Sequence, residues 1–579
     1  MSQPVLQTWT GAWPVIKSSL PLSISEGVID QNAFDAIEVD ALFNAVNHAS
    51  TTIGQAVLYR SLTQPLQALD AIQAKQDAVK ELQEDPALKA VLERIVQQAS
   101  EDEKNFYLLL FGEFLGSTGT AREEHEIEGF GYLQYRRGVR FMLNLAEEIS
   151  AITPPKSAYL QAIFTQILSF TASRDYSLMQ GPVYLSEQGI HAKEQRETSW
   201  VPAIIFKPRL FKPLLISLVF GALWAVAHFF PTDIFKVSVE AIPTAAIFLV
   251  PMLLAYVPIV GGYDRDHAII PLRNGYRQSQ AIGESLDALG QLDELLSFLR
   301  YAEAYSVPSQ TTEPLTDLPR QTMVLPDFVN AIKQQLNLRA VKNPVLGKGN
   351  PNYVANDFIM EQDRLVLITG PNSGGKTAFC KTITQSQLLA QIGCFIPAET
   401  ATLSVADKIF YQVPEISQLS DGEGRFGTEL KRTKEIFLAS SAKSLIVLDE
   451  LSEGTTFEEK MESSTNVLNG FYRKGCNTLL ITHNHQLVDH FIAEKIGLAK
   501  QVEFSHELPT YRLIEGISRV SHADRVAKKI GFSKQDIDNY LEAEQRIDAS
   551  PVATPPPSLE VGHTGSLPVA TLPPSLEVE

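Results

Sequence analysis

The chain has 579 residues, of which 44% are hydrophobic, and its 49 basic and 67 acidic residues give a formal net charge of −18. This length and composition predict several domains with sizeable cores and argue against a generally basic protein that coats nucleic acid. The three cysteines form no Cys-x-x-Cys pair, so we expect a reducing compartment, no disulfide framework and no zinc site. The first twenty residues predict no signal peptide.

After an N-terminal leader over residues 1–30, the pattern from 31 to 205 is helical. Apolar residues recur at helical spacing, as in Ile72, Val79 and Leu82. By itself this pattern predicts an all-α domain and points to no particular chemistry.

Two uncharged runs follow, at residues 213–230 and 241–260. The first would span about 27 Å as a helix, close to the thickness of a bilayer core, so a transmembrane hairpin is predicted over 206–262. Basic residues flank both ends, whereas the loop between the runs holds only Lys236. This asymmetry predicts a bacterial inner-membrane protein with both chain ends in the cytoplasm. A hairpin buried in a core or lying in the interface is the alternative, because Pro251 should kink the second run.

Residues 263–320 predict a returning helix rich in leucine and then a polar link. From 321 to 547, short apolar runs alternate with helical stretches, as in an α/β domain. Residues 548–579 are rich in proline, serine and glutamate and repeat one motif, at Ala553–Val561 and again at Ala570–Val578. This composition predicts a disordered tail, with a partner-binding motif as the alternative.

The most informative stretch is Leu365–Thr377, LVLITGPNSGGKT, in which an apolar strand leads into a Gly-x-x-x-x-Gly-Lys-Thr turn and a helix. Glycines in such a turn let successive N–H groups point at phosphate oxygens. Lys376 can reach the β- and γ-phosphates of ATP, and the hydroxyl of Thr377 can bind Mg²⁺. The predicted nucleotide-binding residues are Gly370, Pro371, Asn372, Ser373, Gly374, Gly375, Lys376 and Thr377. The alternative is a glycine-rich turn that binds nothing.

A second apolar strand, Ser444–Glu450, ends in two carboxylates. We expect Asp449 to hold Mg²⁺ through its water shell and Glu450 to orient or deprotonate the attacking water. A third strand, Leu479–Ile481, is soon followed by His483. At the strand ends where α/β sheets bind ligands, a γ-phosphate sensor is favoured over a structural histidine.

Together these elements resemble the MutS family of ATPases, best known from DNA mismatch repair. The resemblance is carried by Ile368–Thr377 (ITGPNSGGKT), Gly393–Ala398 (GCFIPA), Val447–Thr455 (VLDELSEGT), Thr482–Leu487 (THNHQL) and Tyr511–Ile530. Ser50–Gly54 and Leu66–Leu82 are similar to the family's core domain, and Leu286–Tyr305 is similar to its returning lever helix. The family implies Mg-ATP hydrolysis by a dimer that meets through its ATPase domains.

The departures from the family pattern are also specific. Residues 1–30 are too short for the family's mismatch-reading domain, so we expect that domain to be missing. The predicted hairpin falls where the DNA clamp would lie. The segment Leu419–Leu430 resembles the signature that caps ATP on the partner subunit. One alignment gives the capping role to Gly424, and another gives it to Ser420.

The expected fold is therefore a multidomain one, with an α/β P-loop ATPase domain of the ABC/MutS type and an all-α core and lever domain interrupted by a transmembrane hairpin. The expected function is a membrane-anchored, dimeric ATPase with Lys376, Glu450 and His483 as catalytic residues, which moves its lever with nucleotide state. A scaffold with a degenerate nucleotide site is disfavoured because Lys376, Thr377, Asp449 and Glu450 are all present.

The alternative function is an ATP-gated DNA clamp of the mismatch-repair type. Its best local candidate is the basic stretch Tyr135–Arg140, YRRGVR, which is also compatible with an ordinary solvated helix end. We expect any DNA binding to be weak and not specific for mismatches, because few basic residues are available for phosphate contacts.

Overall fold

The computed structural model describes the chain in two compact units, Met1–Arg519 and Val520–Glu579. It describes all residues except 1–2, 12, 117–128, 196–200, 205–259, 306–321, 372–373, 415–423, 452–455, 506–507, 520–529 and 549–579. The second unit contributes the helix α19 (Lys534–Asp548). All further elements belong to the first unit.

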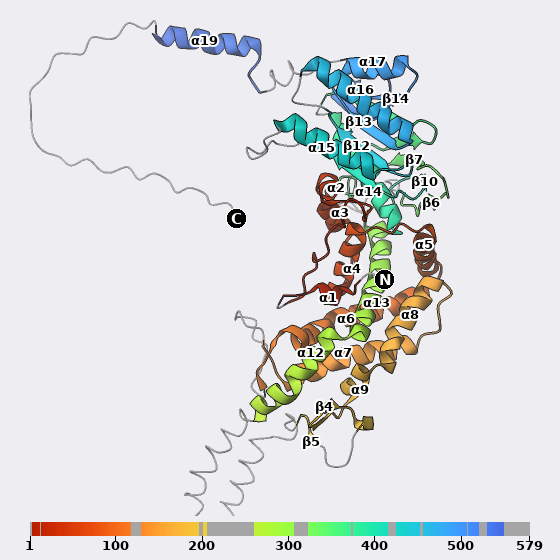
Figure 1. Cartoon of the computed structure of the whole chain (residues 1–579), viewed down its shortest axis with the longest axis vertical. Helices are drawn as coiled ribbons and strands as arrows, with labels where there is room; N and C mark the ends of the chain where they lie inside the picture. The colour runs from red at the N-terminus through yellow and green to blue at the C-terminus, as the bar shows by residue number, and fades with distance from the viewer. Residues whose placement is uncertain are drawn as a thin grey trace, which may run out of the picture. The chain divides into compact units, whose positions relative to one another are not determined.

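Helices form most of the N-terminal half of the first unit (Figure 1). They are α1 (Val5–Thr8), α2 (Gln31–Ile37), α3 (Val39–Val46), α4 (Thr52–Thr63), α5 (Leu69–Glu84), α6 (Pro86–Phe111), α7 (Tyr132–Ser150), α8 (Ala158–Ser169), α9 (Arg174–Gln180), α12 (Ile270–Gln278) and α13 (Gln280–Tyr305). Two small sheets accompany them, one of β1 (Glu113–Phe114) and β2 (Gly129–Phe130), the other of β3 (Tyr184–Ser186), β4 (Gly189–His191) and β5 (Val201–Pro202).

Several of these helices begin at a side chain that caps the first turn. The carboxylate of Asp30 accepts a hydrogen bond from the N–H of Ala33, and Asp85 does the same for Leu88 with Pro86 as the first helical residue. Such caps satisfy N–H groups that have no partner inside the helix, and proline in the first turn loses no hydrogen bond.

The long helix α13 is the axis of the helical region, and Figure 1 shows it running from α12 toward α14 (Lys376–Gln391). The predicted leucine pattern lies here, and the leucines are buried on all sides because α4, α6 and α8 pack on different faces of the helix. α1 also packs on α13, and the N–H of Val5 donates to Asp287 Oδ1 at 2.8 Å.

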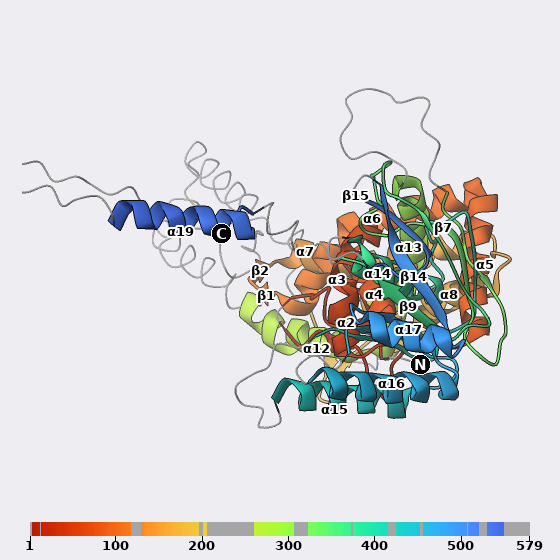
Figure 2. The same ribbon diagram turned by 90° about the horizontal axis from the view of Figure 1, so that it is seen from above.

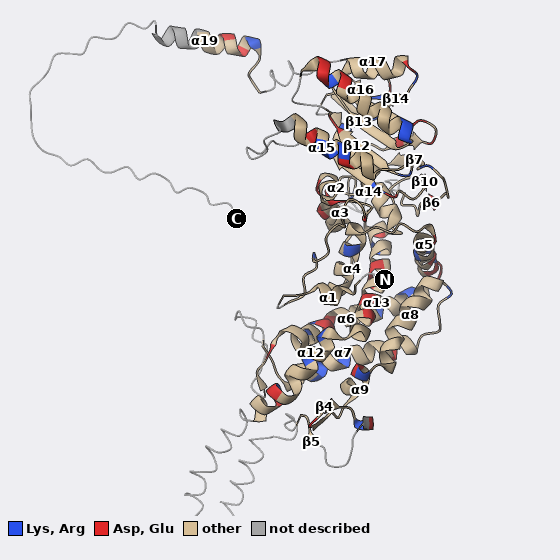
Figure 3. Cartoon of the chain, viewed as in Figure 1, with Lys and Arg blue, Asp and Glu red and all other residues tan. Residues whose placement is uncertain are grey.

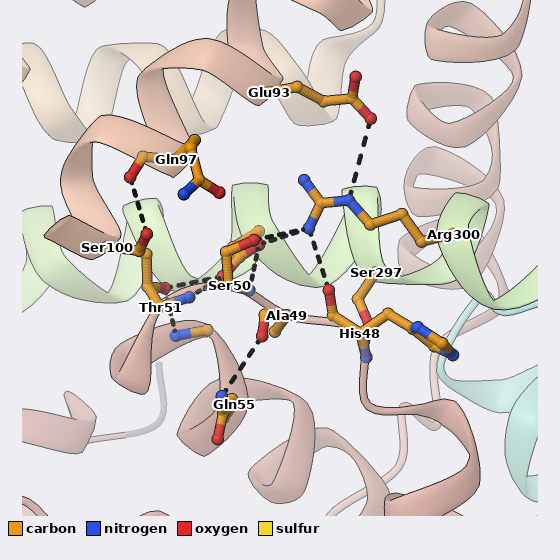
Figure 4. A network of polar contacts seen from close by, with 12 residues as sticks. His48, Ala49, Ser50, Thr51, Gln55, Glu93, Gln97, Ser100, Ser297 and Arg300 are labelled. Atoms are coloured by element: carbon orange, nitrogen blue, oxygen red, sulfur yellow. Dashed lines mark hydrogen bonds and ion pairs between the residues drawn. The ribbon is translucent and has the colours of Figure 1, made fainter.

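A buried polar network fastens the start of α4 to α13 (Figure 4). Asp293 is fully buried and accepts hydrogen bonds from the N–H of Ser50 at 3.2 Å and from the N–H and hydroxyl of Thr51 at 2.7 and 2.8 Å. Arg300 donates to the carbonyl of His48 at 3.0 Å and to Ser50 Oγ at 2.9 Å. The stretch that resembles the family's core domain is therefore a joint between two helices far apart in sequence.

The C-terminal half of the first unit is an α/β region with two sheets. A four-stranded sheet has the order β6-β10-β7-β8, and a six-stranded sheet has the order β11-β12-β13-β9-β14-β15. Their strands are β6 (Asp327–Phe328), β7 (Leu336–Val341), β8 (Asn356–Met360), β9 (Leu365–Thr369), β10 (Thr400–Leu403), β11 (Ile409–Gln412), β12 (Leu445–Asp449), β13 (Asn477–Ile481), β14 (Leu498–Ser505) and β15 (Leu508–Glu515). The larger sheet is parallel except for its edge strand β15.

Helices cover both faces of the larger sheet, so its inner strands are buried on both sides. Alternate strand residues face α14 (Lys376–Gln391) on one side and the helices α15 (Gly424–Ala439), α16 (Phe457–Lys474) and α17 (His485–Ala493) on the other. Figure 2 shows α15 and α16 together on the side away from α14. This doubly covered parallel sheet explains why β9, β12 and β13 are continuous apolar runs in the sequence.

α14 joins the two regions through polar contacts. Gln385 Nε2 donates to the carbonyl of Ile37, and Gln391 Nε2 donates to that of Leu66, both at 2.9 Å. Nearby, Lys75 on α5 and Glu294 on α13 form a buried ion pair with 2.7 Å between Nζ and Oε2. The helix that starts at the phosphate loop is thus hydrogen-bonded directly to the helical region.

The predicted fold class needs a correction. In the part of the chain that the structure describes, no helix is both long and apolar enough to cross a membrane. The runs at 213–230 and 241–259 lie outside the described residues. The predicted fold class is therefore corrected to a mixed α/β multidomain fold, and no described helix supports the transmembrane hairpin or the inner-membrane location predicted from it. The prediction relied on the length of the uncharged runs and on the basic residues that flank them, features of the sequence alone.

Candidate nucleotide site

The glycine-rich turn follows β9, which is flanked by β13 on one side and β14 on the other. Gly370 has φ +135° and Gly375 has φ +85°, values that side chains disfavour. A Cβ on Gly374 would lie 3.0 Å from Cγ2 of Val502 in β14, so the turn can approach that strand only with glycine there. Asn372 and Ser373 lie outside the described residues.

Lys376 and Thr377 open α14 directly after the turn. Lys376 is only 2% exposed, and its ammonium donates to the carbonyls of Gly370 and Pro371 at 2.7 and 2.9 Å. Burial lowers the pKa of Lys376 to about 8. The turn therefore wraps around the ammonium of its own lysine at the N-terminal end of a helix, a position that favours anions.

The two acidic residues lie at the end of β12, next to this helix start. Asp449 Oδ2 accepts a hydrogen bond from the hydroxyl of Thr377 at 3.2 Å. Glu450 has φ +59°, and its N–H donates to the carbonyl of Ile481 at 2.9 Å. A non-glycine residue in this conformation is uncommon and is held by its surroundings. The carboxylate of Glu450 lies 3.3 Å from Nε2 of His483, which follows β13.

An open pocket of about 1070 Å³ collects most of these groups. Thr377, Asp449, Glu450 and His483 all line it. The structure thus brings together predicted residues that lie more than a hundred positions apart in the sequence. Ser420 is outside the described residues and Gly424 is the first residue of α15, so both candidates for the capping role stay predictions.

Sequence reasoning missed three residues at this site. Lys460 from α16 and Arg519 line the same pocket. Tyr511 of β15 has φ +61°, and its ring would be 3.2 Å from a Cβ on Gly375. Tyr511 is still 54% exposed although its ring lies beside the phosphate loop. Tyr511 and Arg519 lie in the stretch Tyr511–Ile530, which gave no role to single residues, and the signal for Lys460 was only a lysine in the first turn of a helix.

A parallel sheet with helices on both faces and a strand, glycine-rich turn and helix unit at its ligand-binding edge is typical of α/β proteins that bind nucleotides. Within that class the chain belongs to the MutS family. Residues 366–548 match MutS domain V, and residues 22–163 match MutS domain III. The predicted family resemblance is confirmed for these two domains.

The chain is similar to several curated proteins. It is 31% identical over 220 residues to the DNA mismatch repair protein MutS of a Thermotoga species, which covers 37% of this chain and 28% of the relative. Its identity to the protein of that name from a Synechocystis species is 25% over 498 residues, or 79% of this chain and 53% of the relative. The Endonuclease MutS2 of Shouchella clausii is 31% identical over 277 residues, or 47% of this chain and 32% of the relative. The chain thus matches between about a quarter and about half the length of these relatives.

Proposed function

We propose that the chain binds Mg-ATP and hydrolyses it. The observation that carries this proposal is that the Thr377–Asp449 pair and the Glu450–His483 pair line one pocket, directly beside the glycine-rich turn and Lys376 at the start of α14. The matched family supports it, because MutS domain V spans all of these residues. Neither the glycine-rich turn nor the carboxylates would suffice alone, since the turn accounts for nucleotide binding and the carboxylates account for hydrolysis.

The residues also fit the metal that the reaction needs. A hydroxyl and a carboxylate oxygen 3.2 Å apart, beside a loop for phosphates, suit Mg²⁺, which binds oxygen ligands and keeps several waters. When bound, the ion would neutralise charge on the β- and γ-phosphates. Glu450 would accept the proton of the attacking water, and His483 would hold the Glu450 carboxylate in place and sense the terminal phosphate.

Movement of the helical region with nucleotide state is the proposed output. Its support is the path from the phosphate loop through α14 to Ile37 and Leu66, whose carbonyls accept the two glutamine hydrogen bonds. A shift at the start of a stiff, buried helix is passed to its far end. The helical region would therefore respond directly to the occupant of the loop.

We further propose a homodimer that meets through the ATPase domains. α15, which follows the signature-like segment, leaves Leu430 42% and Leu438 68% exposed. A partner subunit that meets this helix would cover both leucines. Sizing of the Glu450→Gln protein with and without ATP tests this, and a monomer in saturating ATP would contradict it.

The central test is the Glu450→Gln substitution in the full chain. It removes the proton acceptor but keeps the shape of the side chain, so we expect ATP to stay bound while turnover falls by about a hundredfold or more. Lys376→Ala is the complementary variant and should lose much of the ATP affinity instead. Hydrolysis at the wild-type rate by Glu450→Gln would overturn the assignment.

DNA binding is a second candidate function, favoured by the basic stretch on α7. Arg137 and Arg140 are exposed and Arg136 is partly exposed, and none of the three forms an ion pair with a described residue. Basic residues gather on α7 and α12 (Figure 3). On α12, burial and the nearby charge of Arg277 lower the pKa of Arg273. Two of the similar proteins are named DNA mismatch repair proteins, which also supports DNA binding.

The test for this second candidate is binding to duplex DNA over a salt series. Changing both Arg137 and Arg140 to Gln should reduce the slope of log affinity against log salt by about 2, since each phosphate contact contributes about 0.9. Arg94→Gln is the control, because Arg94 is exposed but already lies 3.4 Å from Glu148. Homoduplex and single-mismatch duplex should compete equally, and a clear preference for the mismatch would contradict the predicted lack of mismatch specificity.

A further inference from the structure

Lys460 occupies an unusual position on α16. The buried face of this helix is formed by Ser464, Leu468 and Phe471, at the spacing of successive turns. Lys460 lies one turn before Ser464 on the same face, where the pattern predicts an apolar or small residue. Instead, its side chain is partly exposed and lines the pocket that also contains Asp449 and Glu450.

The charge of Lys460 is not accounted for by local helix electrostatics. A cation in the first turn opposes the helix dipole, whereas acidic residues there are favourable, as with the neighbouring Glu458 and Glu459. No carboxylate in the described part of the chain forms an ion pair with Lys460. The other cation at the pocket, Arg519, is already bound to Asp489, with 2.6 Å between Nη2 and Oδ1. Among the described residues, Lys460 is thus the pocket lysine without an acidic partner, and its charge can serve an anion that enters.

We propose that Lys460 binds the terminal phosphate of ATP in its own subunit and stabilises the negative charge on the phosphoryl group during transfer. This inference rests on the proposed ATPase function. In the step itself, the water oxygen forms a bond to the γ-phosphorus, the bond to the bridging oxygen breaks, and the water proton goes to Glu450. Lys460 stays protonated and transfers nothing, because its contribution is a positive charge near the three γ-oxygens.

The assignment makes Lys460 a discriminator between ATP and ADP. The phosphate loop holds phosphates that both nucleotides share, and Lys376 reaches the β- and γ-phosphates, whereas Lys460 would contact only the γ-phosphate, which ADP lacks. Loss of Lys460 should therefore weaken ATP binding and slow turnover but leave ADP binding unchanged. A merely solvated lysine would alter none of these quantities.

The experiment compares Lys460→Met, Lys460→Arg and Arg473→Met in the full chain. Arg473 lies in the last turn of the same helix and is exposed, so it controls for loss of one positive charge on α16. Turnover is measured directly, and ATP and ADP affinities are measured with Glu450→Gln as the common background. We expect Lys460→Met to lower turnover by about tenfold or more and to reduce the preference for ATP over ADP, with Lys460→Arg close to the unaltered protein.

Equal turnover and an equal ATP-to-ADP preference in Lys460→Met and Arg473→Met would overturn the inference. A lower unfolding temperature of Lys460→Met would identify a folding defect, and in that case Lys460→Gln replaces it as the test variant. Failure of the ATPase proposal looks different, because then the unaltered chain would bind no ATP or Glu450→Gln would hydrolyse at the full rate.

Discussion

The joint between α4 and α13 and the nucleotide pocket both contain carboxylate side chains, but the carboxylate of the joint is buried and those of the pocket face open space. In the joint, Asp293 is fully buried and its oxygens accept hydrogen bonds from Ser50 and Thr51. In the pocket, Asp449 and Glu450 are partly exposed and line an open volume of about 1070 Å³. A carboxylate whose oxygens are filled by the protein stabilises the fold, whereas one that faces an open pocket is available for a ligand.

The comparison is tested most strongly by removing one carboxylate from each region. Asp293→Ala leaves the buried N–H groups of Ser50 and Thr51 without their acceptor and removes the carboxylate that lies 3.5 Å from Nη1 of Arg300, so we expect the free energy of unfolding to fall by about 3–5 kcal/mol. Asp449→Ala should change stability by no more than about 1 kcal/mol, since its surroundings are open to water. Urea denaturation of both variants measures this contrast. A loss of stability in Asp449→Ala as large as in Asp293→Ala would contradict the division into structural and functional carboxylates.

The prediction of intermediate size concerns the stability effect of a substitution at Gly54, in the joint. A Cβ on Gly54 would lie 2.3 Å from Oδ2 of Asp293, which its hydrogen bonds hold in place. Gly54→Ala should therefore destabilise the protein by about 1–3 kcal/mol, the usual cost of overpacking.

Gly275 in α12 is the matched control for Gly54, because a Cβ there would meet nothing within 4 Å. Gly275→Ala should instead stabilise by about 0.5–1 kcal/mol through helix propensity. If Gly54→Ala were as stable as Gly275→Ala, the joint would be looser than the structure indicates.

The same contrast explains what could be predicted from the sequence. The turn before Lys376 and the acidic end of β12 are local motifs, so their place on the fold followed from neighbouring residues. Tyr511 and Lys460 reach the site only through tertiary packing of an edge strand and of α16, and no local pattern specifies that. Likewise, the sequence of residues 1–30 predicted no particular contact, although Val5 is fully buried and its N–H donates to Asp287 on α13, 282 positions later in the chain.

The membrane prediction failed for a related reason. It was drawn from the length of the uncharged runs at 213–230 and 241–260 and from their basic flanks, without any contact to another element, and no described helix supports it. By contrast, the leucine pattern of α13 was confirmed, because a helix with other helices packed around it buries apolar residues on several faces. The sequence pattern that reflects packing between helices was therefore more reliable here than the uncharged runs interpreted as membrane spans.

The smallest effect is a pH dependence within the joint. Glu103 on α6 is buried, and its Oε1 accepts hydrogen bonds from the N–H and hydroxyl of Thr52 at 2.7 and 2.8 Å. Tyr107 lies 3.0 Å from its Oε2. Burial raises the pKa of Glu103 above its usual value of 4.5, although these hydrogen bonds act in the opposite direction.

A raised pKa means that the folded state holds the proton more tightly than the unfolded state. The stabilising contribution is therefore complete below pH 4.5 and is lost as pH rises through the folded-state pKa. Glu103→Gln mimics the protonated carboxyl, since its amide can donate to the Tyr107 oxygen while its carbonyl still accepts from Thr52. The variant should gain stability relative to the unaltered chain as pH rises from 4.5, by at most about 1.4 kcal/mol per pH unit. Glu101→Gln, an exposed change on the same helix, should show no such trend, and a flat or falling difference for Glu103→Gln would mean that the hydrogen bonds outweigh burial at this carboxylate.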